Sequence, residues 1–303
     1  MTDSLTAVIL GVIEGITEFL PISSTGHLLI AEQWLPRQSD LFNIVIQTGA
    51  VLAVIPLFHK RFHQFIFNWG DRAVREYFFK IAVAFAITGA GGLVIDKKGY
   101  KLPETLWPVA VALLLGGIAF IVVETMLSKG RKAGEPDRSD LSHVTWAIVI
   151  AMGLGQLVAA IFPGASRSGT TILLCLILGL SRPLATEYSF LVSIPTMLAA
   201  GGWKVFKEFH HHSAAASQEN WQMVIIATVV SAVVSFIAVK WLLRFVQTHT
   251  FIGFGWYRVA LGGALLIALA THVIGQNADH NSNTALAISP RPPAACLCVA
   301  GSQ

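Results

Sequence analysis

Long apolar segments dominate this sequence and restrict it to a small set of folds. Six of them are long enough to cross a membrane as helices, because a bilayer core about 30 Å thick needs roughly 20 apolar residues per crossing. Hydrophobic residues make up 54% of the chain, charged residues only 13%, and the mean hydropathy is +0.65. This composition excludes an ordinary water-soluble domain and predicts an all-α polytopic membrane protein with six transmembrane helices. The six segments cover about residues 41–58, 78–95, 107–127, 185–203, 221–243 and 251–274.

Four further apolar segments are too short or too polar to cross alone, and they form two adjacent pairs. The pairs span residues 5–20 with 22–35, and 143–162 with 169–180. We predict that each pair is a re-entrant helical hairpin, because non-helical backbone at membrane depth is tolerated only where protein buries it or where it lines a cavity. Each half of the chain is then one hairpin followed by three crossings. Since three is odd, the halves enter the membrane from opposite sides, as in an inverted-topology repeat.

These patterns also predict the domain organisation. A single membrane domain covers residues 1–275, with repeat one at about 5–127 and repeat two at about 143–274. Residues 276–303 are polar and then rich in proline and alanine, without a periodic pattern. They are therefore predicted to form a disordered tail outside the fold.

The distribution of basic residues predicts how the protein is oriented. Ten lysines and arginines occupy one set of predicted loops and six occupy the other, so the first set is expected to be cytoplasmic and both termini to lie on the outer side. The net charge of +4 lies in these loops, so it reports topology, and nucleic-acid binding is not expected. The larger set is Lys60, Arg61, Arg72, Arg75, Lys129, Arg131, Lys132, Arg138, Lys240 and Arg244, and the smaller is Arg37, Lys97, Lys98, Lys101, Lys204 and Lys207.

One motif occurs twice in the sequence, once in each predicted hairpin. Both copies interrupt an apolar segment with proline, hydroxyl residues and glycine, and paired interruptions of this kind in two halves of a membrane protein indicate a binding site. At a constant offset, Gly11 falls on Gly153, Glu14 on Gln156, Pro21 on Pro163 and Ser24 on Ser166.

Glu14 and Glu18 are the candidate metal ligands or general bases. They are four residues apart and share one helix face. An ionisable side chain at the bilayer centre costs about 2.5–3.5 kcal/mol, so two carboxylates there are expensive unless they are used. Mg²⁺ commonly binds one or two carboxylates together with phosphate oxygens of a substrate. The alternative is a pair near the interface that stabilises its helix by hydrogen bonds.

The hydroxyl-rich segment after Pro21 is a candidate phosphate site. It opens a predicted half-helix, whose N-terminus offers free N–H groups and a partial positive charge. The hydroxyls can equally serve only as helix caps. Ser24 beside His27 also forms a candidate nucleophile and base, although His27 can equally be a packed, hydrogen-bonded core residue. The segment is Ser23, Ser24, Thr25, Gly26 and His27.

Arg167 marks the corresponding point in the second half. A guanidinium binds phosphate through two parallel hydrogen bonds and stays charged, and nearby glycines let backbone N–H groups approach an anion. Two half-helix N-termini would then converge on one anion. The alternative is that Arg167 serves only as a partner for Glu14 or Glu18. The surrounding candidates are Ser166, Ser168, Gly169 and Thr171.

Three other polar residues have weaker interpretations. Glu187 is expected to pair with Arg167 or Arg182, or to act in the site. Glu124 is expected at the membrane interface, near the end of a crossing. Gln156 replaces the first carboxylate in the second copy and is expected to form a hydrogen bond within the site.

At these motifs the sequence resembles the undecaprenyl-pyrophosphate phosphatase family, also called the bacitracin-resistance family, from about Leu5 to Ile274. The resemblance implies an enzyme of the bacterial inner membrane that removes the terminal phosphate of undecaprenyl diphosphate and so recycles the lipid carrier for peptidoglycan. It implies a polyprenyl diphosphate substrate amid membrane lipids, a site open toward the periplasm, and a need for Mg²⁺ or Ca²⁺. The tail after about Gly275 departs from the family pattern.

The family's functional residues carry over to matching positions of this chain. Glu14 and Glu18 would be linked to the metal or act as bases, Ser24 would be the nucleophile and His27 an acid or base. Arg167 would hold the diphosphate, and Ser166, Ser168 and Thr171 would line the phosphate pocket. Further matches are Gln47, Gly49, Glu187, Ser189, Phe190, Tyr257 and Arg258.

A second class of function is a carrier that moves a polyprenyl phosphate across the membrane, because inverted repeats with broken helices are a transporter architecture. The Glu pair beside a serine and a histidine favours chemistry, since a carrier needs anion contacts but no metal-binding carboxylates. A purely structural role does not fit the cost of the buried charges. A homodimer is compatible with the sequence.

Overall fold

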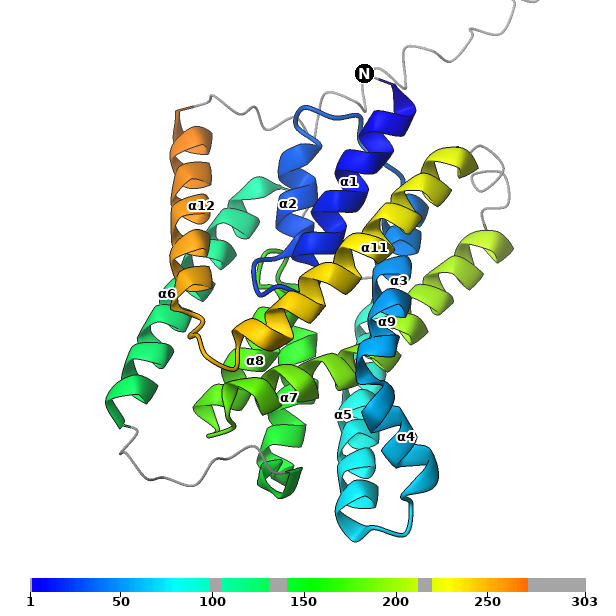
Figure 1. Ribbon diagram of the computed structural model, residues 1–303. Coiled ribbons are helices and arrows are strands. Elements are labelled where there is room, and N and C mark those ends of the chain that lie inside the picture. Colours follow the sequence, from blue (N-terminus) through cyan, green and yellow to red (C-terminus); the bar gives the residue numbers. More distant parts are fainter. Residues whose placement is uncertain (1, 99–104, 131–140, 212–219, 272–303) are drawn as a thin grey trace, which may run out of the picture.

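The computed structural model describes residues 2–98, 105–130, 141–211 and 220–271, and all regular secondary structure in these ranges is helical (Figure 1). Six helical segments there are long and apolar enough to cross a membrane, so the predicted all-α multi-pass membrane fold is confirmed. They are α3 (Asp40–Val54) continued by η1 (Ile55–Phe58) and α4 (His59–Phe67), then α5 (Arg72–Lys97), α6 (Leu106–Gly130), α9 (Arg182–His211), α11 (Trp221–Phe245) and α12 (Ile252–Ala270).

Side chains cap the N-termini of several helices, and apolar residues cover the outer faces of the long ones. Ser39 and Thr145 accept hydrogen bonds from backbone N–H groups three residues on, and Asp71 caps α5 in a similar way. Large apolar side chains such as Leu115 and Ile267 are 60% and 66% exposed. An outer surface of this kind suits contact with lipid tails.

Four shorter helices form two pairs, as predicted from the short apolar segments. They are α1 (Asp3–Thr17) with α2 (Ser24–Ala31), and α7 (Trp146–Ile161) with α8 (Arg167–Ile177). At 1.5 Å per residue these helices are only about 12–24 Å long, less than the thickness of a bilayer core. Each pair is joined by a short loop that carries one copy of the motif. Their re-entrant placement in a membrane stays a prediction.

Several helix contacts correspond between the two halves. α1 packs on α11 as α7 packs on α5, α3 packs on α11 as α9 packs on α5, and α3 with α9 and α6 with α12 pair across the halves. In Figure 1, α1 and α2 lie in the upper part of the view and α7 and α8 in the lower part, with the loops of the two pairs between them. The predicted boundaries of the repeats and of the single domain are not tested by this arrangement. The short η2 (Leu141–His143) precedes α7.

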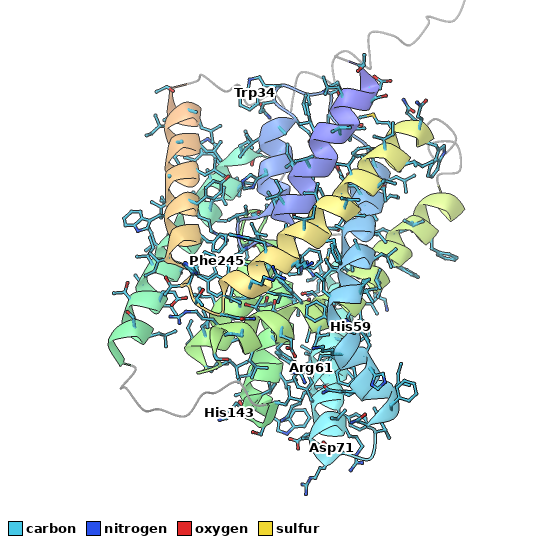
Figure 2. The ribbon with its side chains drawn as sticks, in the orientation of Figure 1. Trp34, His59, Arg61, Asp71, His143 and Phe245 are labelled. Atoms are coloured by element: carbon cyan, nitrogen blue, oxygen red, sulfur yellow. The ribbon has the colours of Figure 1, made fainter. Side chains whose placement is uncertain are left out.

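The two ends of the bundle differ in the residues they carry. Figure 2 shows Trp34 at the end near the N-terminus, and Arg61 and Asp71 toward the opposite end. The orientation of these ends in a cell stays a prediction. The predicted tail, 276–303, and the loop cations Lys101, Arg131, Lys132 and Arg138 lie outside the described residues.

Candidate active site

The loops that follow α1 and α7 meet inside the bundle. The Arg167 Nη2 atom lies 2.8 Å from Glu18 Oε1, although the two residues are 149 positions apart in the sequence. Ser168 Oγ donates a hydrogen bond of 3.1 Å to the Leu20 carbonyl oxygen. The first turns of α2 and α8 therefore lie on either side of one junction.

Both half-helices begin at a serine in a strained backbone conformation. Ser23 has φ 74° and Ser166 has φ 65°, and their hydroxyls accept hydrogen bonds from the N–H groups of Gly26 and Gly169 at 3.3 and 3.2 Å. A non-glycine residue in the left-handed region costs about 1–3 kcal/mol, and such strain persists only where the surrounding structure imposes it. The junction is therefore held in one defined backbone geometry.

These caps correct the expected register of the two motifs. The constant offset placed Ser24 on Ser166, but the structure places Ser23 and Ser166 at the same cap position. The second loop has one more residue between its proline and its cap, and it turns at Gly164, which has φ 89°. Ser24 therefore corresponds in position to Arg167.

Glu18 connects these two corresponding residues. Its Oε2 atom accepts hydrogen bonds from Ser24 Oγ at 2.5 Å and from Gln47 Nε2 at 3.2 Å, while Oε1 accepts from Arg167. The side chain is only 3% exposed, and hydrogen bonds to a charged acceptor of this kind are about twice as strong as neutral ones. Glu18 thus holds a hydroxyl from one half-helix and a guanidinium from the other.

Two charged side chains at the junction have buried atoms without a hydrogen-bond partner among the described residues. They are the Nη1 atom of Arg167 and the Oε2 atom of Glu14. A buried polar group left unpaired costs about 1–3 kcal/mol, and more when the group is charged. The free N–H groups suit an anion and the free oxygen suits a cation. Arg167 is therefore a partner of Glu18 through Nη2 and keeps Nη1 available.

The carboxyl pair fits a divalent cation that a substrate helps to bind. The side chains of Glu14 and Glu18 interact directly, and Glu14 is 1% exposed. Within the described ranges, no group of three or more His, Cys, Asp and Glu residues converges on one point. A cation at this pair would complete its shell with phosphate oxygens and water, which is how Mg²⁺ is commonly held.

His27 contacts residues other than Ser24. Its Nδ1 atom lies 2.7 Å from the Ser23 carbonyl oxygen, and its Nε2 atom lies 2.7 Å from the hydroxyl of Tyr257, whose ring stacks on the imidazole. Because a carbonyl oxygen only accepts, Nδ1 carries the proton, and in a neutral ring Nε2 accepts from Tyr257. Ser24 donates its hydrogen bond to Glu18, so its partner is a carboxylate and not the expected histidine.

Some of the remaining predicted residues form hydrogen bonds that hold the helices together, and one is exposed. Thr171 Oγ1 lies 2.6 Å from Ser189 Oγ and so ties α8 to α9, while Ser168 lies 3.3 Å from Ser166. Thr25 is exposed. Gln156 of α7 donates a hydrogen bond of 3.1 Å to Thr88 of α5.

Arg258 of α12 is a structural residue to which the sequence interpretation assigned no role. It is fully buried, and its guanidinium donates to carbonyl oxygens of both loops: Pro21 at 3.1 Å, and Gly164 and Ala165 at 3.2 and 3.1 Å. Gly116 of α6 leaves room for it, since a Cβ there would clash with the guanidinium of Arg258. A lone arginine in an otherwise apolar helix was the signal that could have revealed this role.

The expected partners of Glu187 were wrong. Glu187 pairs with Arg61 at 2.6 Å, and not with Arg167 or Arg182. Glu124 is fully buried and binds Arg182 through both carboxylate oxygens, and its expected place at the membrane interface stays a prediction. It also accepts a hydrogen bond of 2.9 Å from the backbone of Phe251, so it fastens the start of α12 to α6 and α9.

Comparison with known proteins extends the match over nearly the whole described chain. The family profile described as bacitracin resistance protein BacA matches residues 7–264. The undecaprenyl-diphosphatase of Rhizobium etli is 49% identical over 273 residues, which are 90% of this chain and 99% of that protein. Those of Xanthomonas euvesicatoria pv. vesicatoria (strain 85-10) and Xanthomonas axonopodis pv. citri (strain 306) are each 47% identical over 270 residues, which are 89% of this chain and 98% of each relative. The chain belongs to the bacitracin resistance protein BacA family.

Proposed function

We propose that this protein is an undecaprenyl-diphosphatase, which converts undecaprenyl diphosphate and water to undecaprenyl phosphate and phosphate. One observation carries the proposal: at the junction of two helix N-termini, a buried guanidinium N–H and a buried carboxylate oxygen have no hydrogen-bond partner among the described residues. The first suits a phosphate group and the second a cation that accompanies it. Relatives 47–49% identical over about nine-tenths of the chain bear this name.

The anion would lie between the first turns of α2 and α8. Both helices direct the positive ends of their dipoles at the junction, and Arg167 Nη1 adds charged donors there. A divalent cation held by Glu14 and Glu18, either Mg²⁺ or Ca²⁺, would neutralise charge on the transferred phosphate. The isoprenoid chain would lie in an apolar groove among the crossing helices.

The reaction has two routes. In the first, Ser24 Oγ attacks the terminal phosphorus while its proton passes to Glu18 Oε2, 2.5 Å away. The bond from the terminal phosphorus to the bridging oxygen breaks, undecaprenyl phosphate leaves, and water then hydrolyses the phosphoserine. In the second, a carboxylate and His27 activate water for direct attack. The contact of Ser24 with Glu18 favours the first route.

His27 has the hydrogen bonds of a positioned acid or base. The Ser23 carbonyl fixes its ring, and the Tyr257 hydroxyl occupies Nε2 until a substrate displaces it or uses it as a relay. In this proposal His27 Nε2 takes a proton from the water that attacks the phosphoserine, and Glu18 returns the Ser24 proton to Oγ as the phosphorus–oxygen bond breaks.

The activity fits a place in envelope synthesis. Removing one phosphate returns the lipid to the monophosphate form and so recycles the carrier for cell-wall synthesis, and the matching family profile is described as a bacitracin resistance protein. We place the protein in the bacterial inner membrane, with both hairpins re-entrant and the site open to the periplasm. A homodimer stays a prediction.

The names of the relatives favour this activity over the carrier. The buried carboxylate beside Ser24 agrees with that preference, because anion transport alone has no use for a base in contact with a hydroxyl.

The direct test is phosphate release from undecaprenyl diphosphate by the purified protein in detergent. We expect release with Mg²⁺ or Ca²⁺, none with EDTA, and recovery when the cation is restored. With substrate radiolabelled in its terminal phosphate, denaturing quench should leave label on wild type and none on Ser24→Ala. Absence of release under every divalent cation, from folded protein that binds the lipid, would refute the activity. Full activity in Ser24→Ala would eliminate only the covalent route.

A further inference from the structure

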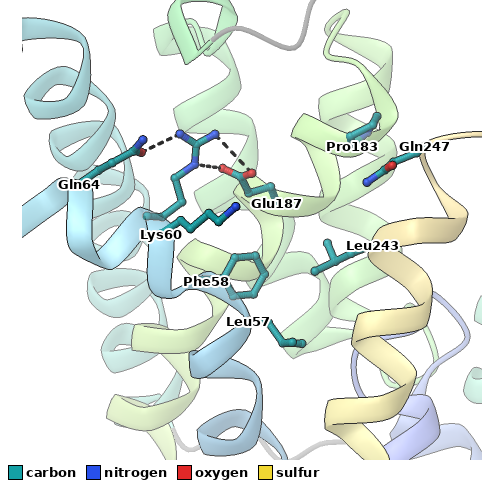
Figure 3. A pocket seen from close by; sticks show the side chains of 9 residues that line it. Leu57, Phe58, Lys60, Gln64, Pro183, Glu187, Leu243 and Gln247 are labelled. Carbon is teal, nitrogen blue, oxygen red and sulfur yellow. Dashed lines mark hydrogen bonds and ion pairs between the residues drawn. The ribbon is translucent and has the colours of Figure 1, made fainter.

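A cavity of about 410 Å³ is lined in part by Arg61 (Figure 3), which lies toward the end of the bundle that carries Asp71 (Figure 2). It is formed where η1 and α4 approach α9 and the end of α11, and none of its lining residues belongs to the candidate active site. The apolar lining is Leu57, Phe58, Pro183 and Leu243, and the polar lining is Lys60, Arg61, Gln64, Glu187 and Gln247.

The wall of this cavity is held by Arg61. Its Nε and Nη2 atoms bind Glu187 at 2.6 and 3.5 Å, and its Nη1 atom donates to Gln64 at 2.9 Å. Its guanidinium carbon also lies 6.0 Å from the centre of the Tyr77 ring. The hydrogen-bonding capacity and charge of Arg61 are therefore directed at its neighbours, and Glu187 is neutralised by the same contacts.

Lys60 and Gln247 leave polar groups available in the cavity. Figure 3 shows Lys60 extending into it from α4 and Gln247 facing it from the opposite side. Neither side chain has a hydrogen bond or an ion pair with another described residue. Since Arg61 and Glu187 cancel, the cavity keeps one positive charge and one amide donor.

The surroundings place this cavity at the level of lipid head groups. α4 continues the first crossing beyond Pro56, and large aromatic side chains follow it at this end of the bundle. Phe67 is 70% exposed, Trp69 41% and Phe79 51%. Exposed aromatic rings beside basic residues are typical of the boundary between the bilayer core and water.

We propose that this cavity binds the phosphate group of an anionic lipid, with the first carbons of the lipid chain against Leu57 and Leu243. A cation without a partner among the described residues suits a phosphate group, and basic pockets between transmembrane helices bind anionic head groups. The volume of about 410 Å³ accommodates a head group and leaves the chains in the bilayer. The lipid is an acidic phospholipid or a polyprenyl monophosphate. The site is distinct from the catalytic junction and does not depend on its chemistry.

The test is lipid binding to the purified full chain in detergent, followed by native mass spectrometry. Phosphatidylglycerol and a polyprenyl monophosphate are titrated separately, with phosphatidylcholine as the uncharged comparison. Lys60→Gln removes the free cation, and Gln247→Glu adds a negative charge to the same cavity. Lys240→Gln is the matched control, because Lys240 is an exposed lysine of α11 that does not line the cavity. Thermal unfolding in the same detergent checks that each variant is folded.

We expect Lys60→Gln and Gln247→Glu each to weaken binding of an anionic lipid by about fivefold, and Lys240→Gln to leave it unchanged. Loss confined to phosphatidylglycerol identifies a phospholipid, and loss confined to the prenyl lipid identifies the monophosphate. Equal affinity of both lipids for wild type and the two cavity variants would overturn the proposal. Displacement of the lipid by an equal concentration of inorganic phosphate would also overturn it, since the site would then bind a free anion.

Discussion

At the residue scale, Glu18 joins the two halves of the candidate site. One oxygen binds Arg167 from the second half, and the other accepts from Ser24 and Gln47 of the first. The sequence indicated that Glu18 was functional, because a carboxylate in an apolar helix is costly. It did not indicate which partner each oxygen would have, because that depends on how two distant loops meet. The expected pairing of Ser24 with His27 came from their closeness in sequence alone.

Glu18→Gln should reduce kcat for phosphate release by about 10²–10⁴-fold, because an amide is a far weaker base for the Ser24 proton. The change is nearly isosteric, so the fold should persist. Glu32→Gln is the matched control, since Glu32 lies at the far end of α2 and binds the backbone of Gln38. Steady-state kinetics on the two variants measure the difference. A folded Glu18→Gln protein with wild-type kcat would show that Glu18 is not the base.

At the element scale, the apolar pattern predicted the helices, and their ends depended on finer chemistry. The first crossing was expected to end at about residue 58, but its helical path continues through α4 to Phe67. Hydropathy alone could not show this, because His59, Lys60 and Arg61 are polar although they remain helical. The register of the two loops was also missed, since one extra residue at Gly164 shifts the cap.

Arg258 of α12 links the two loops, because its guanidinium donates hydrogen bonds to carbonyl oxygens of both. Arg258→Met should lower the free energy of unfolding by at least about 2 kcal/mol, since several buried carbonyls lose their donor. Thermal unfolding in detergent gives this difference. Arg258→Lys should recover part of it by keeping the charge.

Arg244→Met serves as the control, because Arg244 is exposed at the end of α11. A midpoint for Arg258→Met equal to that of wild type would contradict the role of Arg258 as a tie between the loops.

At the scale of the whole molecule, several helix contacts correspond between the two halves, such as α1 on α11 and α7 on α5. The lengths of the apolar segments were enough to predict six crossing helices and two pairs of shorter ones. The pairs formed by Glu124 with Arg182 and by Arg61 with Glu187 could not be predicted. Each joins helices far apart in sequence, and the choice among several charged partners is made only when the bundle packs.

The orientation of the bundle in the membrane is a prediction about the whole molecule. In a background with Cys296 and Cys298 replaced by serine, cysteine is introduced at Trp34 or at Asn68, while Cys175 stays because it is buried. A membrane-impermeant maleimide added to intact spheroplasts should label Trp34→Cys and spare Asn68→Cys until the membrane is lysed. The reverse pattern would place the basic end outside and contradict the charge-based orientation.

The most direct test of the whole account is phosphate release from undecaprenyl diphosphate by Arg167→Ala. If Arg167 Nη1 is the anion-binding donor, the variant should lose about 10²–10³-fold in kcat/KM with Mg²⁺ present. Arg72→Ala, at an exposed arginine of α5, should behave as wild type. A folded Arg167→Ala protein that releases phosphate at the wild-type rate would contradict the claim that the diphosphate is bound where the two half-helices meet.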